Sequence, residues 1–263
     1  MPQRGSGPTV SSSGTGYFSV NEYKSILSYA AKRHVRVIPE FDMPGHSHAA
    51  INAMLARYRK YISTNETAAT EFLLSDLEDE SDYMSIQEYT DNAINPCIES
   101  TYKFIDTVIA SVKSMHANIQ PLTLYHVGGD EVADMAWTGS PACQPLNASR
   151  TDLMKHFLTR ASEICAIHGL DMVVWEDGVY YEGAPINRSS FASRNVYSTV
   201  WDNIWENGSG QRSYELANND YKVSPTWTRS IFCCIRETTL TESPKDPHFA
   251  HYIKLIIIET SLN

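Results

Sequence analysis

Apolar and polar positions along this chain predict helices that are each followed by a strand. The first helix has Asn21 as its cap and one apolar side, and a short apolar run at residues 35–38 predicts the strand after it. The same order returns at residues 98–116 and 122–127, at 151–168 and 172–175, at 196–201 after a short connection, and at 211–219 before a strand that begins at Tyr221. Strands separated by helices pair in parallel through right-handed crossovers, so the sequence predicts an α/β fold.

Polar and aromatic side chains collect where the predicted strands end, which favours a barrel over a doubly wound sheet. No glycine-rich phosphate loop of the GxGxxG type is present. Active sites of (β/α)8 barrels are built from residues at many strand ends. The residues at these positions are Glu40, Asp42 and His46, then Asp130 and Glu131, then Trp175, Glu176 and Asp177, then Trp201 and Asp202.

Only about five strands can be counted, whereas a closed barrel needs eight. We therefore predict an incomplete (β/α)8 TIM barrel. Residues 1–20 are expected to be a flexible leader, and residues 21–224 the partial barrel. Residues 62–92 are acidic and predict a long loop over one mouth of the barrel, and residues 225–263 predict a divergent C-terminal tail.

Composition narrows the class of function. The net charge is −10, from 31 acidic and 21 basic side chains, so we expect no nucleic-acid partner. Five cysteines without CxxC spacing argue against a disulfide scaffold and a cysteine metal site. No apolar run approaches the ~20 residues of a membrane span. Four N-x-Ser/Thr sequons, at Asn65, Asn147, Asn187 and Asn207, favour a lysosomal or extracellular location reached through the secretory pathway, although no signal segment is visible.

The stretch HVGGDE at residues 126–131 is the most informative one. Two adjacent carboxylates, Asp130 and Glu131, leave an apolar strand through Gly128 and Gly129, which allow a sharp turn and a close approach of a ligand. An arbitrary Asp-Glu pair more often caps a helix. Here the context favours catalysis, because neighbouring carboxylates raise each other's proton affinity and one of them can act as a general acid near neutral pH.

Three motifs in order, PEFDMPGH at residues 39–46, HVGGDE at 126–131 and VWED at 174–177, resemble family 20 glycoside hydrolases, the β-N-acetylhexosaminidases and chitobiases. The resemblance runs from about residue 2 to about residue 224. It implies a (β/α)8 barrel that removes terminal non-reducing N-acetylhexosamine from oligosaccharides or glycoconjugates with retention of configuration. In that family the 2-acetamido group of the substrate replaces an enzyme nucleophile. No cofactor and no metal are implied.

The resemblance also implies a role for each residue of the predicted site. Glu131 would be the general acid and then the base, and Asp130 would orient the acetamido group and stabilise the oxazolinium ion. His46 would hydrogen-bond the catalytic glutamate. Trp175 and Trp201 would wall the pocket around the sugar, and Asp42 matches an acidic residue of the same motif, although a carboxylate before Pro-Gly is often only a turn former.

The family's upstream arginine motif and its downstream tyrosine are not recognisable in this sequence. The resemblance therefore implies that the barrel lacks the first strand and the last strands, and weak or absent turnover is expected of this chain. Two other classes of function stay open. One is a metal-dependent barrel hydrolase that uses His46 and His48 together with His126 and Asp130. The other is a non-catalytic glycan-binding module that uses Trp175 and Trp201 as its platform. The sequence does not predict the oligomeric state, the preference between glucosamine-type and galactosamine-type substrates, or whether the tail is native.

Overall fold

A computed structural model describes residues 18–202, 209–225, 235–243 and 246–258 of the chain. Most of the leader predicted at residues 1–20 and the sequon at Asn207 lie outside these ranges. The helices and strands follow in the order α1 (Val20–Ala31), β1 (Arg36–Met43), α2 (His48–Tyr61), α3 (Glu66–Thr70), α4 (Glu99–His116), β2 (Leu124–Gly128), α5 (Arg150–Ile167), β3 (Asp171–Trp175), α6 (Glu176–Val179), β4 (Tyr180–Tyr181), β5 (Ala184–Pro185), β6 (Val196–Val200), α7 (Arg212–Asn218), β7 (Lys222–Pro225), β8 (Ile235–Ser243) and β9 (Asp246–Ile258).

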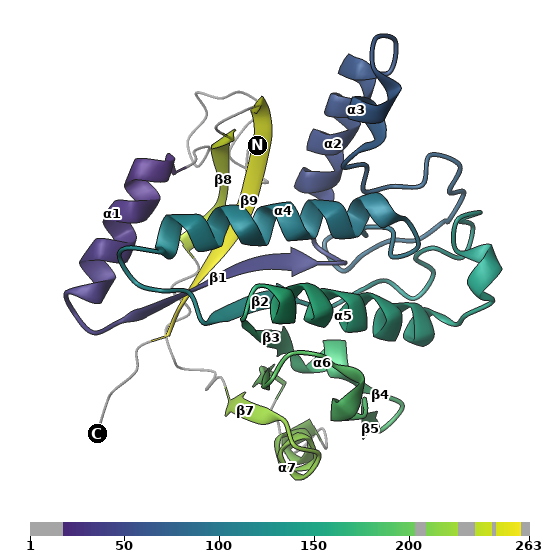
Figure 1. The fold of residues 1–263 in the computed structure, drawn as a ribbon. Coiled ribbons are helices and arrows are strands. Elements are labelled where there is room, and N and C mark those ends of the chain that lie inside the picture. Colours follow the sequence, from purple (N-terminus) through teal and green to yellow (C-terminus); the bar gives the residue numbers. More distant parts are fainter. Residues whose placement is uncertain (1–17, 203–208, 226–234, 244–245, 259–263) are drawn as a thin grey trace.

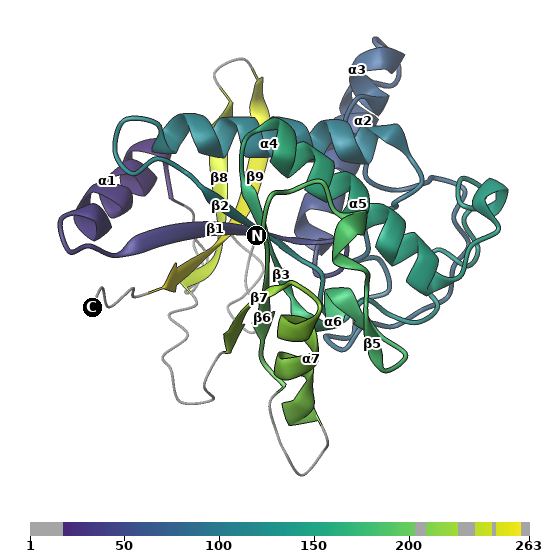
Figure 2. The same ribbon diagram turned by 60° about the horizontal axis from the view of Figure 1, so that its bottom comes forward.

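One sheet carries the architecture, in the strand order β7-β6-β3-β2-β1-β9-β8. The pairs from β1 to β2, β2 to β3, β3 to β6 and β6 to β7 are all parallel, which confirms the predicted α/β class. β9 pairs antiparallel with β1, and β8 pairs antiparallel with β9, so residues predicted as a divergent tail form two strands of the same sheet. Helices α1, α4 and α5 cover one side of the parallel strands, and α2 and α3 project away from the end of β1 (Figures 1 and 2).

Side chains of each parallel strand alternate between two faces because successive Cβ atoms of a strand point in opposite directions. The face under the helices belongs to the main core and includes Val37, Tyr125, Met172 and Val196. The other face carries a smaller apolar cluster of Ile38, Leu124 and Val173, against which Tyr197 packs. Both faces are therefore covered, as is typical of parallel strands in barrels.

The same alternation puts polar side chains on the second face. Glu40 follows Ile38 at the interval of two residues, His126 follows Leu124, and Trp175 follows Val173, so all three lie on the face opposite the helices. Glu40 and His126 are paired in the register of β1 and β2 and are buried. The interior of the sheet is thus polar near its carboxyl edge.

Two local predictions were wrong. Ser19, and not Asn21, caps α1, since its side chain accepts from the Glu22 N–H while Glu22 bonds back to the Ser19 backbone. Residues 39–43 were placed after the first strand, but β1 continues to Met43, so Glu40 and Asp42 are strand residues. Continued pairing of Met43 with Gly128 across a β-bulge keeps this segment in the sheet.

Two features were not predicted at all. Helix α2 directly follows the PEFDMPGH motif and buries Ile51 and Met54. Cys97 and Cys143 form a disulfide that joins the segment before α4 to the loop after β2. Among the described residues, no helix is long and apolar enough to cross a membrane.

Candidate active site

The loop that leaves β2 presents Asp130 and Glu131 at the carboxyl edge of the sheet. Gly128 has φ +78°, and a Cβ on it would lie 1.9 Å from the Asp42 Oδ1 atom, so only glycine fits between these strands. Glu131 itself has φ +49°, in the left-handed region. The side chains of Asp130 and Glu131 are 17% and 33% exposed, which leaves both carboxylates within reach of solvent and of a ligand.

His46 comes from the loop that leaves β1 and meets both carboxylates. This loop contains a cis peptide bond between Met43 and Pro44, and His46 has φ +53°. The His46 Nε2 atom lies 3.3 Å from Asp130 Oδ2 and 3.4 Å from Glu131 Oε2. The predicted catalytic residues from two neighbouring strand ends therefore come together.

Asp177, at the start of α6, hydrogen-bonds the backbone of Glu131. Its Oδ2 atom accepts a 2.9 Å hydrogen bond from the backbone N–H of Glu131, and its Oδ1 atom accepts a 3.1 Å bond from the indole of Trp201. Burial raises the pKa of the Asp177 carboxyl, these two bonds act against the rise, and the charge of Asp130 adds to it. Asp177 thus ties the ends of β2, β3 and β6 together, a connection that the sequence did not predict.

Glu176 is fully buried behind this site and holds the end of β6. It accepts hydrogen bonds from the backbone N–H groups of Trp201 and Asp202, at 2.9 and 3.1 Å, and its Oε1 atom lies 3.2 Å from the Arg212 guanidinium. Burial raises the pKa of Glu176 to about 7 despite these partners. Glu176 therefore holds the end of β6 with a carboxyl whose pKa is raised by its burial.

The two predicted aromatic residues occupy different environments. Trp201 is 41% exposed, so its indole face is open to a ligand beside Asp177. Trp175 is 5% exposed; its Nε1–H donates to Glu40 Oε1 at 2.8 Å, and its ring lies 4.7 Å from the ring of His126. Trp175 is thus fixed in the polar interior of the sheet by Glu40 and His126.

Asp42 lies on the inner face of β1, beside the predicted catalytic residues. One ligand atom each from Asp42, His46 and Asp130 lie within 4.8 Å of one another, a spacing that a divalent cation could bridge. The other histidines of the metal-dependent alternative lie apart from this group. His48 contacts Asp91 at 2.7 Å, and His126 is buried 3.4 Å from Glu40. The predicted pair of imidazoles therefore does not converge on Asp130.

A further contact comes from the acidic segment that was predicted to cover the barrel mouth. Gln87 donates from Nε2 to the Glu131 Oε2 atom at 3.0 Å, so this segment reaches the acidic pair. Nothing in the local sequence around Gln87 distinguishes it from a loop residue, since its partner is 44 positions away.

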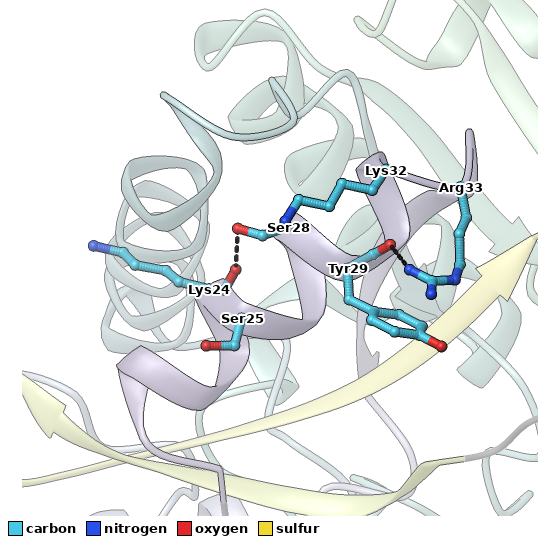
Figure 3. A pocket seen from close by; sticks show the side chains of 6 residues that line it. All are labelled: Lys24, Ser25, Ser28, Tyr29, Lys32 and Arg33. Atoms are coloured by element: carbon cyan, nitrogen blue, oxygen red, sulfur yellow. Dashed lines mark hydrogen bonds between the residues drawn. The ribbon is translucent and has the colours of Figure 1, made fainter.

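The hollow drawn in Figure 3 lies elsewhere on the molecule. It is a surface depression of about 540 Å³ along α1, lined by Lys24, Ser25, Ser28, Tyr29, Lys32 and Arg33. Within it the Arg33 guanidinium lies over the Tyr29 ring. No residue of the acidic pair or of its partners contributes to it, so we do not assign it to the candidate site.

Comparison with known families decides the assignment. The model of the catalytic domain of glycosyl hydrolase family 20 matches residues 3–252. The chain belongs to glycosyl hydrolase family 20. The resemblance found in the three sequence motifs is thereby confirmed.

Relatives within family 20 agree with this assignment. The chain is 40% identical over 235 residues to a β-hexosaminidase of Vibrio vulnificus, with 86% of this chain and 27% of that protein covered. It is 35% identical over 260 residues to the N,N'-diacetylchitobiase of Vibrio harveyi, with 85% and 29% covered. It therefore spans less than a third of the length of these relatives.

A solved family 20 structure supports the fold. The exo β-N-acetylglucosaminidase of Vibrio harveyi in complex with N-acetylglucosamine aligns with a TM-score of 0.64 and 26% identity, over 85% of this chain and 30% of that one. A TIM-barrel-like α/β fold follows from this similarity and from the parallel sheet.

Proposed function

We propose that this protein hydrolyses terminal non-reducing N-acetyl-D-hexosamine residues from β-N-acetylhexosaminides by substrate-assisted retaining catalysis. The observation that carries the proposal is the convergence of His46, Asp130 and Glu131, with Asp177 bonded to the Glu131 backbone. The names of the family 20 relatives, β-hexosaminidase and N,N'-diacetylchitobiase, describe the same reaction class.

Each carboxylate has one task in this reaction. Glu131 donates its proton to the glycosidic oxygen while the acetamido carbonyl oxygen of the substrate attacks the anomeric carbon, so the C–O bond to the leaving group breaks and an oxazolinium ion forms. Asp130 accepts the acetamido N–H and stabilises the positive charge. Glu131, now a carboxylate, takes a proton from a water molecule that attacks the anomeric carbon and opens the oxazolinium ring. This step regenerates the protonated Glu131 and releases the sugar with its configuration retained.

The surrounding residues position this pair. His46 lies within hydrogen-bonding distance of both carboxylates and is suited to hold their geometry as the proton leaves and returns. Trp201 offers an indole face to the sugar, Asp42 lies beside Asp130, and Trp175 lines the buried end of the pocket. Because Trp175 is buried, its contribution is to the shape of the pocket and not to an exposed stacking platform.

We further propose that the parallel strands are part of an eight-stranded barrel, in which residues 21–224 provide the catalytic face and residues 62–92 a loop over its mouth. The substrate class is an oligosaccharide or glycoconjugate that ends in N-acetylhexosamine. A compartment reached by secretion fits the Cys97–Cys143 disulfide and the exposed sequon residues Asn65, Asn147 and Asn187.

Two p-nitrophenyl glycosides test the proposal, one of N-acetyl-β-glucosamine and one of β-glucose, which has no acetamido group. We expect turnover of the first only, and a loss of about 100-fold or more in kcat for Glu131→Gln. Glu66→Gln, at an exposed carboxylate in the first turn of α3, is the control. Turnover by Glu131→Gln equal to that of the parent would refute the assignment. Because we expect turnover by this chain to be weak, the assay needs long incubation.

Removal of metal separates this proposal from the metal-dependent alternative. Since the proposed steps need only Glu131, Asp130 and the substrate, we expect EDTA to leave the rate unchanged. A rate that falls to background with EDTA and returns with Zn²⁺ would favour a cation held by Asp42, His46 and Asp130.

A further inference from the structure

The loop that carries His46 is held at both ends by a segment, residues 92–94, which we call the strut. The Ser47 N–H donates to the first carbonyl of the strut at 2.9 Å, and the last N–H of the strut donates to the Pro44 carbonyl at 2.7 Å. The residues at both ends of the strut are buried, so water does not compete for these bonds. His46 therefore lies between two fixed points of its loop.

Trp137 joins the same strut to the loop that carries the acidic pair. It follows Glu131 by six residues, it is 3% exposed, and its indole N–H donates to the Ile94 carbonyl at 3.0 Å. Ile94 thus bonds the His46 loop through its N–H and Trp137 through its carbonyl. One buried residue connects the two loops whose side chains meet in the candidate site.

The backbone of Trp137 has an unfavourable conformation. Its φ of +65° lies in the left-handed region, which bulky side chains rarely adopt. A strained residue persists only where its surroundings hold it, and such residues gather at functional sites. The side chain of Trp137 packs in the main core, so packing and the indole bond together hold the loop in this shape.

The two loops also approach each other closely beside His46. A Cβ on Gly45 would lie 3.0 Å from the Asp130 carbonyl oxygen, so little free space separates them. The His46 Nε2 atom is 3.3 Å from Asp130 Oδ2 and 3.4 Å from Glu131 Oε2. Both distances are at the long end of hydrogen bonding, so a shift of about 0.5 Å between the loops decides whether His46 bonds to the acid.

We propose that Trp137 is a positioning residue that holds His46 at bonding distance from the acidic pair, acting through the strut. Because Trp137 is buried, it offers no surface to a sugar, and its effect is on proton transfer and not on sugar binding. The kinetic part of this inference rests on the proposed hydrolase function. The structural part, the link from Trp137 to His46, does not.

Trp137→Phe tests the inference, because it removes the indole N–H and keeps an aromatic ring. We expect kcat on the p-nitrophenyl glycoside of N-acetylglucosamine to fall about tenfold, with KM within about twofold of the parent. The alkaline limb of the kcat/KM profile should move to higher pH by about half a unit, because a hydrogen bond from His46 favours the charged form of the acid. Tyr221→Phe is the matched control and should change neither, since Tyr221 is 4% exposed and its hydroxyl donates to the Ile186 carbonyl at 2.7 Å.

A second variant perturbs the strut and keeps the aromatic ring that it changes. The Tyr83 hydroxyl accepts a hydrogen bond from the Ala93 N–H at 3.0 Å, so Tyr83→Phe releases the middle of the strut. We expect the same direction of change as in Trp137→Phe, with a fall of about threefold in kcat. Kinetics measured well below the unfolding temperature of each variant ensure that a lower kcat is not a loss of folded protein.

Nuclear magnetic resonance of the His46 ring tests the link without any turnover. The ring signals are assigned by their loss in His46→Gln, and we expect them to shift in Trp137→Phe and Tyr83→Phe but not in Tyr221→Phe. Unchanged His46 signals in Trp137→Phe overturn the inference. An equal loss of kcat in the control, or a rise in KM with kcat unchanged, overturns it as well. A parent chain without turnover refutes the proposed function alone, since the His46 signals then still decide whether Trp137 holds His46.

Discussion

Replacement of Asp177 by asparagine tests whether the acidic pair depends on its support from α6. The Asp177 carboxylate accepts two N–H bonds, from the Glu131 backbone at 2.9 Å and from the Trp201 indole at 3.1 Å. An asparagine has nearly the same shape but only one acceptor oxygen. One of the two donors would then face an amide NH₂ group, which cannot accept its hydrogen bond.

The magnitude follows from the bond that is lost. A hydrogen bond to a charged acceptor is worth about 1.5–3 kcal/mol. Because Asp177 is only partly buried, the lower half of this range is appropriate, and a donor left facing NH₂ adds to it. If that energy holds Glu131 in the position needed for proton transfer, kcat/KM falls roughly 10- to 100-fold, since about 1.4 kcal/mol corresponds to tenfold.

Asp171→Asn is the matched control, because Asp171 lies at the other end of β3 and also accepts two N–H bonds, both from Asn195, at 3.1 and 2.8 Å. Both variants should lose similar amounts of thermal stability, but only Asp177→Asn should lose activity on the p-nitrophenyl glycoside of N-acetylglucosamine. Activity of Asp177→Asn within threefold of the parent, with a lowered unfolding temperature, would show that Asp177 stabilises the fold without positioning the acid.

Three further changes have defined outcomes. Gly128→Ala places a Cβ 1.9 Å from Asp42 Oδ1 at φ +78°, so we expect a loss of about 3 kcal/mol or more in the free energy of unfolding, measured by denaturant titration; an unchanged midpoint would contradict the close approach of β1 and β2. Burial raises the pKa of Glu176 from 4.5 to about 7, so the folded state holds a proton that the unfolded chain releases. The resulting stability is complete below pH 4.5 and declines by about 3 kcal/mol as the pH rises to about 7; Glu176→Gln should remove this decline, and equal pH profiles would refute the shift. Reduction of the Cys97–Cys143 disulfide, which closes a loop of 46 residues, should lower the unfolding free energy by about 4 kcal/mol, and an unfolding temperature insensitive to reductant would contradict the bridge.

The order of helices and strands was predictable because it depends on the local spacing of apolar residues. The strands at 122–127, 172–175 and 196–201 match β2, β3 and β6 within two residues, since each is a short apolar run with clear ends. The end of β1 was not predictable in this way. Its polar residues Glu40 and Asp42 face the interior of the sheet, where hydrogen bonds compensate for burial, and such partners are not visible in a sequence pattern.

Part of the candidate site was likewise predictable from local sequence, and part of it was not. Asp130, Glu131 and His46 were predicted from motifs, and the structure brings them within 3.4 Å of one another through His46. Gln87 and the bonds made by Asp177 depend on contacts between residues more than 40 positions apart, which local sequence does not specify. The capping box of α1, in contrast, was predictable from local sequence, because Ser19 and Glu22 have the spacing that is typical of this motif.

The bond between Trp201 and Asp177, together with that between Asp177 and Glu131, has a kinetic consequence. The proposed site draws on residues from position 42 to position 201, so it is complete only when β6 has docked beside β3. Contacts of such long sequence separation form late during folding, after local helices such as α4 and α5. A nascent or refolding chain would thus acquire its helical signal well before it acquires any catalytic competence, and the gain of activity reports the last stage of assembly.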